Sequence, residues 1–339
     1  MKNGNSVKIA VIGGGSWGTA LAIHCANLGM SVSLWVYEED LARRMMENGE
    51  NDTYLPGEEL PPNLKPTSSF EHCLTGAGIV FSVVPSHVAR QVWAQARAYL
   101  PVDAIIINAT KGIEEKTLLT STEVLVESIG ENILERKVTL SGPTFAKEVA
   151  RGLPAAAVIA GRNMEIAHSV QRTLTSDSLR FYTNRDYIGV EVAGSLKNVM
   201  AISVGICDGL ALGHNARAAL ITRGLAEMAR LGVALGADPL TFQGLAGMGD
   251  LVLTCTGDLS RNRTLGLRLG KGESLEEITG STPMVAEGVR TTRSARDLAL
   301  REKVEMPITE EIYHVLYDGR KPLAALKRMM SRSLKEEGS

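Results

Sequence analysis

Cysteine is scarce in this chain, and its placement argues against two kinds of site. Only four of the 339 residues are cysteine, at positions 25, 73, 207 and 255. They form no CxxC pair and no cluster with histidine, so the sequence predicts neither a metal site nor a disulfide framework. We therefore expect reduced thiols and a cytoplasmic protein.

Excess charge and long apolar runs are also lacking. The chain carries 36 basic and 38 acidic residues, a formal net charge of -2, which predicts no nucleic-acid or anionic-membrane partner. No uncharged apolar run reaches the ~18 residues that a membrane helix needs. Four glycines within residues 13–18 interrupt the apolar stretch near the N-terminus, so no signal peptide is expected there. What remains is the composition of a soluble globular enzyme with a small-molecule partner.

The first half of the chain alternates strand and helix patterns. Such βαβα alternation predicts an α/β domain in which a parallel sheet carries helices on both faces. Residues 51–66 contain four prolines, and we expect an irregular loop there. Strands are expected at 7–13, 31–36, 79–84, 104–110, 137–142 and 155–160, and helices near 17–28, 38–47, 86–98, 116–128, 144–150 and 164–174.

The second half loses its strand signals after about Asp186. Long patterns with helical periodicity follow, and Asp238 with Pro239 is typical of a helix start. The length of the chain corresponds to about two domains. We predict a dinucleotide-binding domain at 1–187 and an all-helical substrate domain at 188–339, with helices at 188–206 and 215–232, after Asp238, and near 260–270, 291–302, 307–318 and 322–334.

A glycine-rich turn is the first candidate site. Residues 9–22 read IAVIGGGSWGTALA, so that Gly13, Gly15 and Gly18 follow an expected strand and open an expected helix. Glycines at these positions allow a tight turn, close approach of a pyrophosphate to the backbone and close packing of helix on strand. In this context the pattern predicts a dinucleotide-binding turn, whereas the same glycines elsewhere would be weak evidence.

The choice between NAD and NADP stays open. An acidic residue at the end of the second strand binds the ribose hydroxyls of NAD, and an arginine there favours NADP. Here the strand ends Trp35-Val36-Tyr37-Glu38, with neither at the expected position. Tyr37 can stack on adenine, and Glu38 or Glu39 can reach the ribose, or these residues simply start the next helix at the surface.

A lysine stands within an apolar helical segment. Residues 189–206 contain only two charged residues, Glu191 and Lys197. An unpaired ammonium in such a helix costs several kcal/mol, enough to lower its pKa. A structural explanation is that Lys197 reaches the surface or pairs with a carboxylate such as Asp208. The functional one is a general acid or base that serves hydride transfer by protonating a developing alkoxide.

Two further segments can complete such a site. Lys111 follows an expected strand, at the edge of an open sheet where ligands collect, and a second ammonium near Lys197 would lower its pKa further. Residues 244–266 hold a glycine-rich turn that ends at Asp250, followed by Ser260-Arg261-Asn262-Arg263. An arginine with polar neighbours at a helix start suits a phosphate or carboxylate. Taken alone, Arg261 and Arg263 would be assigned to a solvated helix face.

Seven blocks, in order, resemble one family closely. They are GGGSWGTALA (13–22), SVVPSHVAR (82–90), NATKGIE (108–114), SGPTFAKEVARGLP (141–154), EVAGSLKNVMAI (191–202), the stretch 244–263 and VAEGVRT (285–291). With these blocks the sequence is similar, over nearly its whole length, to the bacterial-type NAD(P)-dependent glycerol-3-phosphate dehydrogenases. One departure is Val36-Tyr37, where many members carry a basic residue.

The resemblance implies a fold, an activity and a set of site residues. It implies a Rossmann-like N-terminal domain, a helical C-terminal domain like that of 6-phosphogluconate dehydrogenase, and a homodimer. It further implies interconversion of sn-glycerol 3-phosphate and dihydroxyacetone phosphate with NAD or NADP, chiefly to make glycerol 3-phosphate for phospholipid synthesis. Lys197 is then the proton donor, and Asp250 positions it. The implied substrate contacts are Lys111, Gly142, Thr144, Lys197, Asp250, Ser260, Arg261 and Asn262. The implied cofactor contacts are Gly13, Gly15, Ser16, Trp17, Gly18, Tyr37, Lys111, Ala146, Arg261, Val285 and Glu287.

Two other functions compete with this one. A sibling 2-hydroxy-acid reductase of the same fold would need no phosphate clamp. A non-catalytic sensor of nicotinamide nucleotides would be free to lose Lys197 and Asp250, yet the chain has both.

Overall fold

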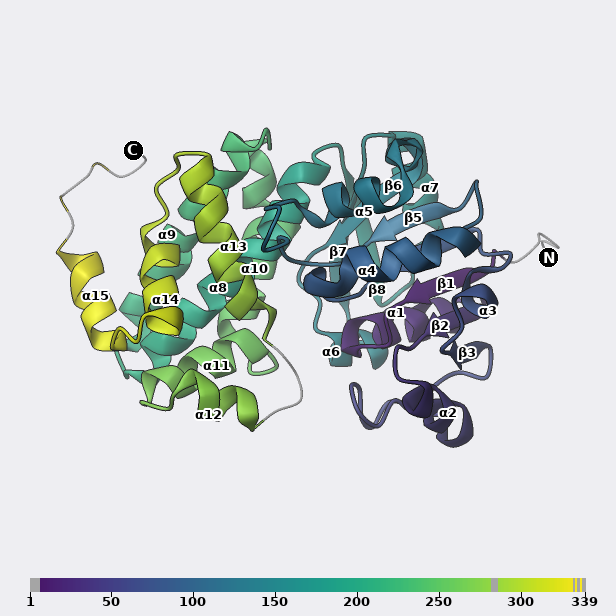
Figure 1. Ribbon diagram of the computed structural model, residues 1–339, viewed down its shortest axis with the longest axis horizontal. Coiled ribbons are helices and arrows are strands. Elements are labelled where there is room, and N and C mark those ends of the chain that lie inside the picture. The colour runs from purple at the N-terminus through teal and green to yellow at the C-terminus, as the bar shows by residue number, and fades with distance from the viewer. Residues whose placement is uncertain (1–6, 282–285, 332, 334–335, 337–339) are drawn as a thin grey trace.

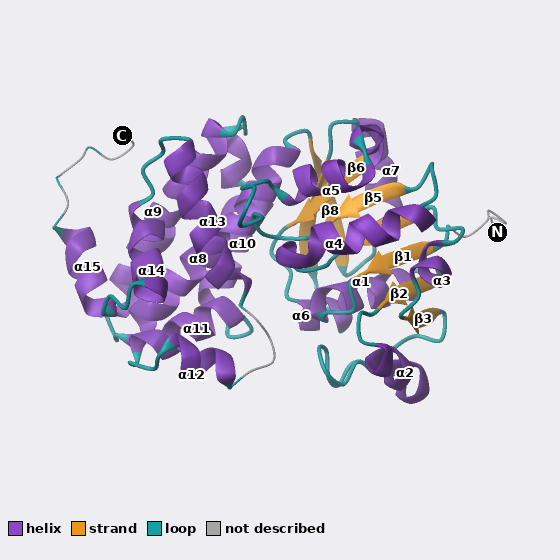
Figure 2. Cartoon of the chain, in the orientation of Figure 1, coloured by secondary structure: helices purple, strands orange, loops and turns teal. Residues whose placement is uncertain are grey.

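One open sheet organises the N-terminal half of the molecule. The computed structural model describes residues 7–281, 286–331, 333 and 336. Its strands follow the order β3-β2-β1-β4-β5-β6-β7-β8, with helices on both faces (Figures 1 and 2). The strands are β1 Ile9–Ile12, β2 Val32–Trp35, β3 Leu64–Thr67, β4 Ile79–Ser82, β5 Ile105–Asn108, β6 Lys137–Ser141, β7 Ala155–Ala160 and β8 Leu179–Asn184.

The strand order reverses at β1. Strand β2 pairs with one side of β1, and β3 pairs with the outer side of β2. Strand β4 then pairs with the other side of β1. The loops that leave β1 and β4 therefore diverge, and in open α/β sheets a ligand-binding crevice lies at such a switch point, at the carboxyl ends of the strands. The glycine-rich turn follows β1, so the strand order places this turn at the crevice.

Both faces of the sheet are buried, as near-continuous apolar strands require. Along β1, Ile9 and Val11 belong to one apolar core while Ala10 and Ile12 belong to the other. The helices are α1 Ser16–Asn27, α2 Glu39–Asn48, α6 Ala146–Ala150 and α7 Met164–Leu174 around the first core, and α3 Phe70–Leu74, α4 Ser86–Ala96 and α5 Ser121–Ile129 around the second. The predicted α/β class with helices on both faces is confirmed.

The sheet is mixed, which corrects the prediction of a parallel one. Strand β7 runs antiparallel to β6, and β8 pairs with β7 in parallel. The connection from Ser141 to Ala155 contains only the short helix α6, and a short connection of this kind returns the chain in the opposite direction. Parallel pairing would have required a longer crossover.

Other corrections concern short elements. Strand β3 lies within the stretch predicted to be irregular and holds Pro66, which an edge strand tolerates. Strand β8 and helices α3, α10 (Asp250–Thr256) and α12 (Leu275–Gly280) were not predicted. Helix α5 begins at Ser121 rather than at 116, because Thr120 and Glu123 form a capping box there.

One long helix lies at the centre of the C-terminal half. The described residues of this half form helices joined by loops, without a strand (Figure 1). Helix α8 (Tyr187–Gly209) is the one described helix long and apolar enough to cross a membrane, and it is buried inside the protein as a core helix. Around it pack α9 (Gly213–Ala234), α10, α11 (Arg261–Gly270), α13 (Glu287–Arg301) and α14 (Pro307–Tyr317). Helix α15 (Pro322–Met330) packs on α14, and the start predicted at Asp238 is a 3-10 turn, Pro239–Gln243.

Glycines let α8 and α11 meet backbone to backbone. A Cβ atom added to Gly205 would lie 2.1 Å from the carbonyl oxygen of Arg263, and one added to Gly266 would lie 2.1 Å from that of Ile202. Each belongs to a GxxxG spacing, with Gly209 and Gly270 as the second members, which face each other in the same way. Small residues at this spacing allow close helix approach. The contact fixes the first turn of α11, which begins at Arg261, against the middle of α8.

We predict that Gly266→Ala destabilises the fold by about 3 kcal/mol, the upper range for an overpacked site, because the new methyl group meets backbone that cannot rotate away. Urea denaturation gives the free energy of unfolding. Gly280→Ala is the matched control, since nothing lies within 4 Å of a Cβ added to that helical glycine, and its effect should stay within about 0.5 kcal/mol. Equal stabilities for the two variants would contradict the backbone contact.

Candidate active site

The glycine-rich turn lines a cavity of about 460 Å³ between the sheet and the helical half. A Cβ added to Gly13 would lie 2.6 Å from the carbonyl oxygen of Val83, and one added to Gly18 would lie 1.8 Å from that of Gly13. These two positions must be glycine for the turn to close against β4. Nothing lies within 4 Å of a Cβ added to Gly15, so a ligand can approach the backbone there.

Donors without a partner lie in the residues that line this cavity. Helix α1 begins after Gly15, which has no side chain to cap the first backbone N–H groups. Within the described part of the chain, the indole Nε1 of Trp17 is the one buried side-chain polar atom without a hydrogen-bond partner. An uncapped helix N-terminus beside an unpaired N–H donor fits the pyrophosphate of a dinucleotide. The hydroxyl of Ser16 is not an unpaired donor, because it donates to the carbonyl oxygen of Tyr54 at 2.5 Å.

The far end of this cavity is aromatic. Tyr37 lines it from the loop after β2 and is 79% exposed, so its ring is available to a base. Trp35 stacks on Phe70 with a centroid distance of 4.4 Å and forms the wall behind it. Glu38 also lines the cavity, and one of its carboxylate oxygens accepts a hydrogen bond of 2.8 Å from the hydroxyl of Tyr54.

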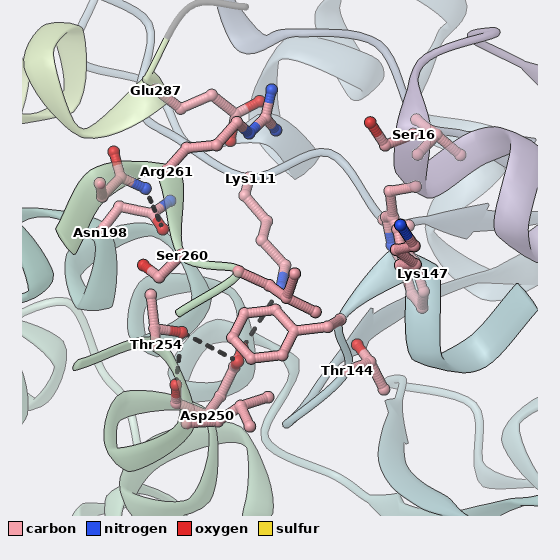
Figure 3. Close-up of a pocket in the computed structure, with 18 of the residues that line it drawn as sticks. Ser16, Lys111, Thr144, Lys147, Asn198, Asp250, Thr254, Ser260, Arg261 and Glu287 are labelled. Carbon is pink, nitrogen blue, oxygen red and sulfur yellow. Dashed lines mark hydrogen bonds and ion pairs between the residues drawn. The ribbon is translucent and has the colours of Figure 1, made fainter. Parts of the chain in front are cut away.

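A second cavity of about 330 Å³ continues from the first and holds a buried charge cluster (Figure 3). The Nζ atom of Lys197 donates to Oδ1 of Asp250, and Nζ of Lys111 lies 3.2 Å from Oδ2 of the same carboxylate. Asp250 is fully buried and Lys197 is 6% exposed. One carboxylate therefore stands between two ammonium groups, and the cluster carries a net positive charge.

Structure outside the cluster fixes the carboxylate. The π-helical turn Leu245–Gly249 runs directly into α10, whose first residue is Asp250. The hydroxyl of Thr254 donates to the backbone carbonyl of Asp250 at 2.6 Å, and the hydroxyl of Ser141 lies 3.5 Å from Oδ2. Asp208, the carboxylate named in the structural alternative for Lys197, is not its partner: Asp208 binds Arg217 and Arg263 at the far end of α8.

Burial and charge tune two groups of the site. Burial lowers the pKa of Lys197 to about 8; the carboxylate of Asp250 opposes this fall, and the ammonium of Lys111 adds to it. Burial also raises the pKa of Glu287 above its ordinary value, while Arg261 opposes the rise. An ammonium with a pKa near neutrality can both release and recover a proton.

Arg261 lines both cavities from the start of α11 (Figure 3). Ser260 caps this helix, since its hydroxyl accepts from the backbone N–H of Arg263 at 3.3 Å. The amide oxygen of Asn262 accepts from the backbone N–H of Gly288, and its amide nitrogen donates to Asn198, both at 2.9 Å. A guanidinium at a helix N-terminus suits an anionic ligand, whereas the amide of Asn262 also joins α8, α11 and α13.

The remaining predicted residues divide into three groups. Thr144, Ala146 and Glu287 line the second cavity, which is called the reaction cavity from here on. Glu287 also lines the first. Gly142 does not line either: it turns the chain after β6 with a φ of 147°, and its carbonyl oxygen accepts from the hydroxyl of Thr144 at 3.1 Å. Val285 lies outside the described residues.

Sequence reasoning missed several residues of the reaction cavity. Asn198 is adjacent to Lys197 and lines the cavity, and Thr254 follows Asp250 by one helical turn. Lys147 also lines it, from α6 (Figure 3). Tyr54 lies in the proline-rich stretch, from which Asn51 donates to the carbonyl oxygen of Gly14 at 2.8 Å. Spacing along a helix signals Thr254, but no local pattern signals Tyr54.

A dinucleotide cleft that opens onto a buried, proton-carrying amine is the arrangement of a nicotinamide-dependent dehydrogenase. Comparison with known proteins narrows this class. Residues 8–167 match the family model of the NAD-dependent glycerol-3-phosphate dehydrogenase N-terminus, and residues 186–327 match that of its C-terminus. The chain therefore belongs to the NAD-dependent glycerol-3-phosphate dehydrogenase family.

Individual relatives agree over the full length. The chain is 51% identical to the glycerol-3-phosphate dehydrogenase [NAD(P)+] of Citrifermentans bemidjiense over 331 residues, which cover 98% of this chain and 99% of the relative. It is 51% identical to the enzyme of the same name from Geobacter sulfurreducens over 332 residues, with the same coverage. The crystal structure of glycerol-3-phosphate dehydrogenase from Coxiella burnetii superposes with a TM-score of 0.92 at 39% identity, over 96% of this chain and 99% of that one.

Proposed function

We propose that this chain interconverts sn-glycerol 3-phosphate and dihydroxyacetone phosphate with a nicotinamide nucleotide. The observation that carries the proposal is the buried cluster of Lys197, Asp250 and Lys111, at the point where the dinucleotide cavity meets Arg261. Family membership and the names of the relatives support the same substrates. Making glycerol 3-phosphate for phospholipid synthesis is the physiological direction that we propose.

In this proposal Lys197 is the proton donor. When bound, the nicotinamide nucleotide supplies or accepts the hydride. As the carbonyl oxygen of dihydroxyacetone phosphate gains negative charge, Lys197 gives it a proton from Nζ, and in the reverse direction the free amine takes that proton back. Asp250 holds the amine in place, and Lys111 favours proton release through its like charge.

The positive end of the cavity favours a phosphorylated substrate. Arg261, the N-terminus of α11 and Lys111 converge on a site that suits a phosphate dianion. Ser260 and Asn262 line the same wall. A 2-hydroxy-acid reductase needs only a carboxylate contact, and a sensor needs no proton donor, so both alternatives explain less of this cavity.

Three further proposals concern organisation. We propose a domain boundary near residue 187, supported by the last strand ending at Asn184 and α8 beginning at Tyr187. A place in the cytoplasm agrees with four buried, unpaired cysteines. Assembly as a homodimer rests on the family resemblance, and light scattering during gel filtration measures it.

We predict that Lys197→Met lowers turnover of dihydroxyacetone phosphate by about 10²–10⁴-fold, the usual contribution of a general acid, while cofactor binding persists. Absorbance of the reduced cofactor at saturating substrate measures turnover, and tryptophan fluorescence measures binding. Lys137→Met is the control, because Lys137 is also buried with a pKa lowered to about 8 but lines neither cavity. Near-wild-type turnover of Lys197→Met would remove Lys197 from the mechanism.

We predict that kcat/KM for reduction falls as the pH rises through about 8, because Lys197 must be protonated to donate. In the oxidation direction the same group must be free, so kcat/KM rises through this range. Asp250→Asn removes the charge that opposes the lowered pKa, while Lys111 still repels, so the fall in reduction should begin at a lower pH. A flat profile in both directions between pH 7 and 10 would contradict the assignment.

We predict that Arg261→Ala raises KM for dihydroxyacetone phosphate by about 100-fold at saturating cofactor, because the phosphate loses a charged partner that lines the cavity. Unphosphorylated dihydroxyacetone, a poor substrate at best, should lose little. Arg268→Ala is the control on the same helix, since Arg268 lines neither cavity and pairs with Glu273. An unchanged KM for the phosphorylated ketone would favour a hydroxy acid as substrate.

A further inference from the structure

The ribose end of the dinucleotide cavity is acidic. Glu38 is the third residue after β2 and lines the cavity, and Glu39 and Asp40 follow it in the first turn of α2. The end of the second strand is where dinucleotide-binding sheets recognise the adenosine ribose. Of these three carboxylates, that of Glu38 lines the cavity and thus stands beside the position where NADP differs from NAD by one phosphate group.

The carboxylate of Glu38 is held in place. Tyr54 donates its hydroxyl to Glu38 at 2.8 Å, and the backbone of Tyr54 is tied to the glycine-rich turn through the hydroxyl of Ser16 at 2.5 Å. Asn51 fixes the same loop to Gly14. One oxygen of Glu38 is occupied by Tyr54, and the other remains available to a ribose hydroxyl.

Among the described residues that line this cavity, no arginine or lysine comes from the segment around Glu38. Among the described residues that line the cavity, the arginines are Arg261 and Arg290, and both come from the helical half. Arg261 also lines the reaction cavity, and Arg290 pairs with Glu115 at 3.2 Å. The two arginines of α2 are paired with acidic residues of α2 and the loop after it, and neither lines the cavity.

We propose that Glu38, held by Tyr54, makes this enzyme prefer NAD(H) to NADP(H). The carboxylate accepts hydrogen bonds from the ribose hydroxyls of NAD, whereas a 2′-phosphate meets like charge, and no described arginine or lysine of the same loop lines the cavity beside it. Like charges brought together at a binding site repel each other and so discriminate against the wrong ligand. The inference rests on the proposed use of a nicotinamide nucleotide and names which of the two fits.

Binding of two fragments without nicotinamide tests the inference directly. Isothermal titration calorimetry compares ADP-ribose with 2′-phospho-ADP-ribose on the wild-type protein, and we expect ADP-ribose to bind at least about tenfold more tightly. Glu38→Gln removes the charge and keeps a hydrogen-bonding amide, so it should reduce this preference about tenfold, mainly by strengthening the phosphorylated fragment. Glu39→Gln is the matched control, because Glu39 is exposed and does not line the cavity, and it should leave the ratio unchanged.

The ratio of kcat/KM for NADH and NADPH should follow the binding ratio in all three proteins. Equal binding of the two fragments to the wild-type protein overturns the inference, as does a Glu38→Gln variant that keeps the wild-type ratio. If the wild-type protein then still oxidises reduced cofactor with dihydroxyacetone phosphate, the proposed function stands without the preference. If neither cofactor is oxidised, the proposed function fails, and the fragments still decide the preference.

Discussion

The pairing of one buried carboxylate with two lysines is the constraint on which the site depends. Asp250 begins α10, Lys197 lies within α8, and Lys111 follows the sheet strand β5. Removing one partner of such a buried pair leaves an uncompensated charge, which costs about 3–5 kcal/mol. The contact that opposes the burial-lowered pKa of Lys197 therefore belongs to a cluster that also joins the sheet to the helices.

Helix α8 explains how an apolar segment holds this centre. Its three charged residues have different partners: Glu191 accepts from the backbone N–H of Thr122 at 2.6 Å, and Lys197 donates to Asp250. The third, Asp208, pairs with Arg217 and Arg263 near the end of the helix. Between them Gly194 leaves room, since a Cβ there would lie 2.6 Å from the hydroxyl oxygen of Ser141. Further along, Gly205 brings α11 close. Each charge in the helix is buried because a specific partner lies opposite it.

Local patterns predicted the parts of the site that depend on local sequence. The strand, the glycine turn and the helix at 9–27 are contiguous, so the dinucleotide cleft follows from spacing alone. The partner of Lys197 does not, because Asp208 lies on its own helix and Asp250 lies 53 residues away, and only tertiary packing chooses between them. Edge strands such as β3 were missed for a related reason: a proline-containing segment pairs only because β2 is already in place.

Charge varies along the cleft in a way that no single motif reveals. At the reaction end four basic residues line the cavity with two acidic ones, an excess that we propose attracts a substrate phosphate; the basic ones are Lys111, Lys147, Lys197 and Arg261, and the acidic ones Asp250 and Glu287. At the ribose end Glu38 lines the cavity, and its own loop supplies no described arginine or lysine to the lining. A phosphorylated ketone bound together with NAD would match this distribution. Their charge lies on the substrate phosphate and the pyrophosphate, and the adenosine ribose of NAD carries only neutral hydroxyls. Since electrostatic complementarity decides specificity more than affinity, we propose that this asymmetry selects which nucleotide and which ketone react together.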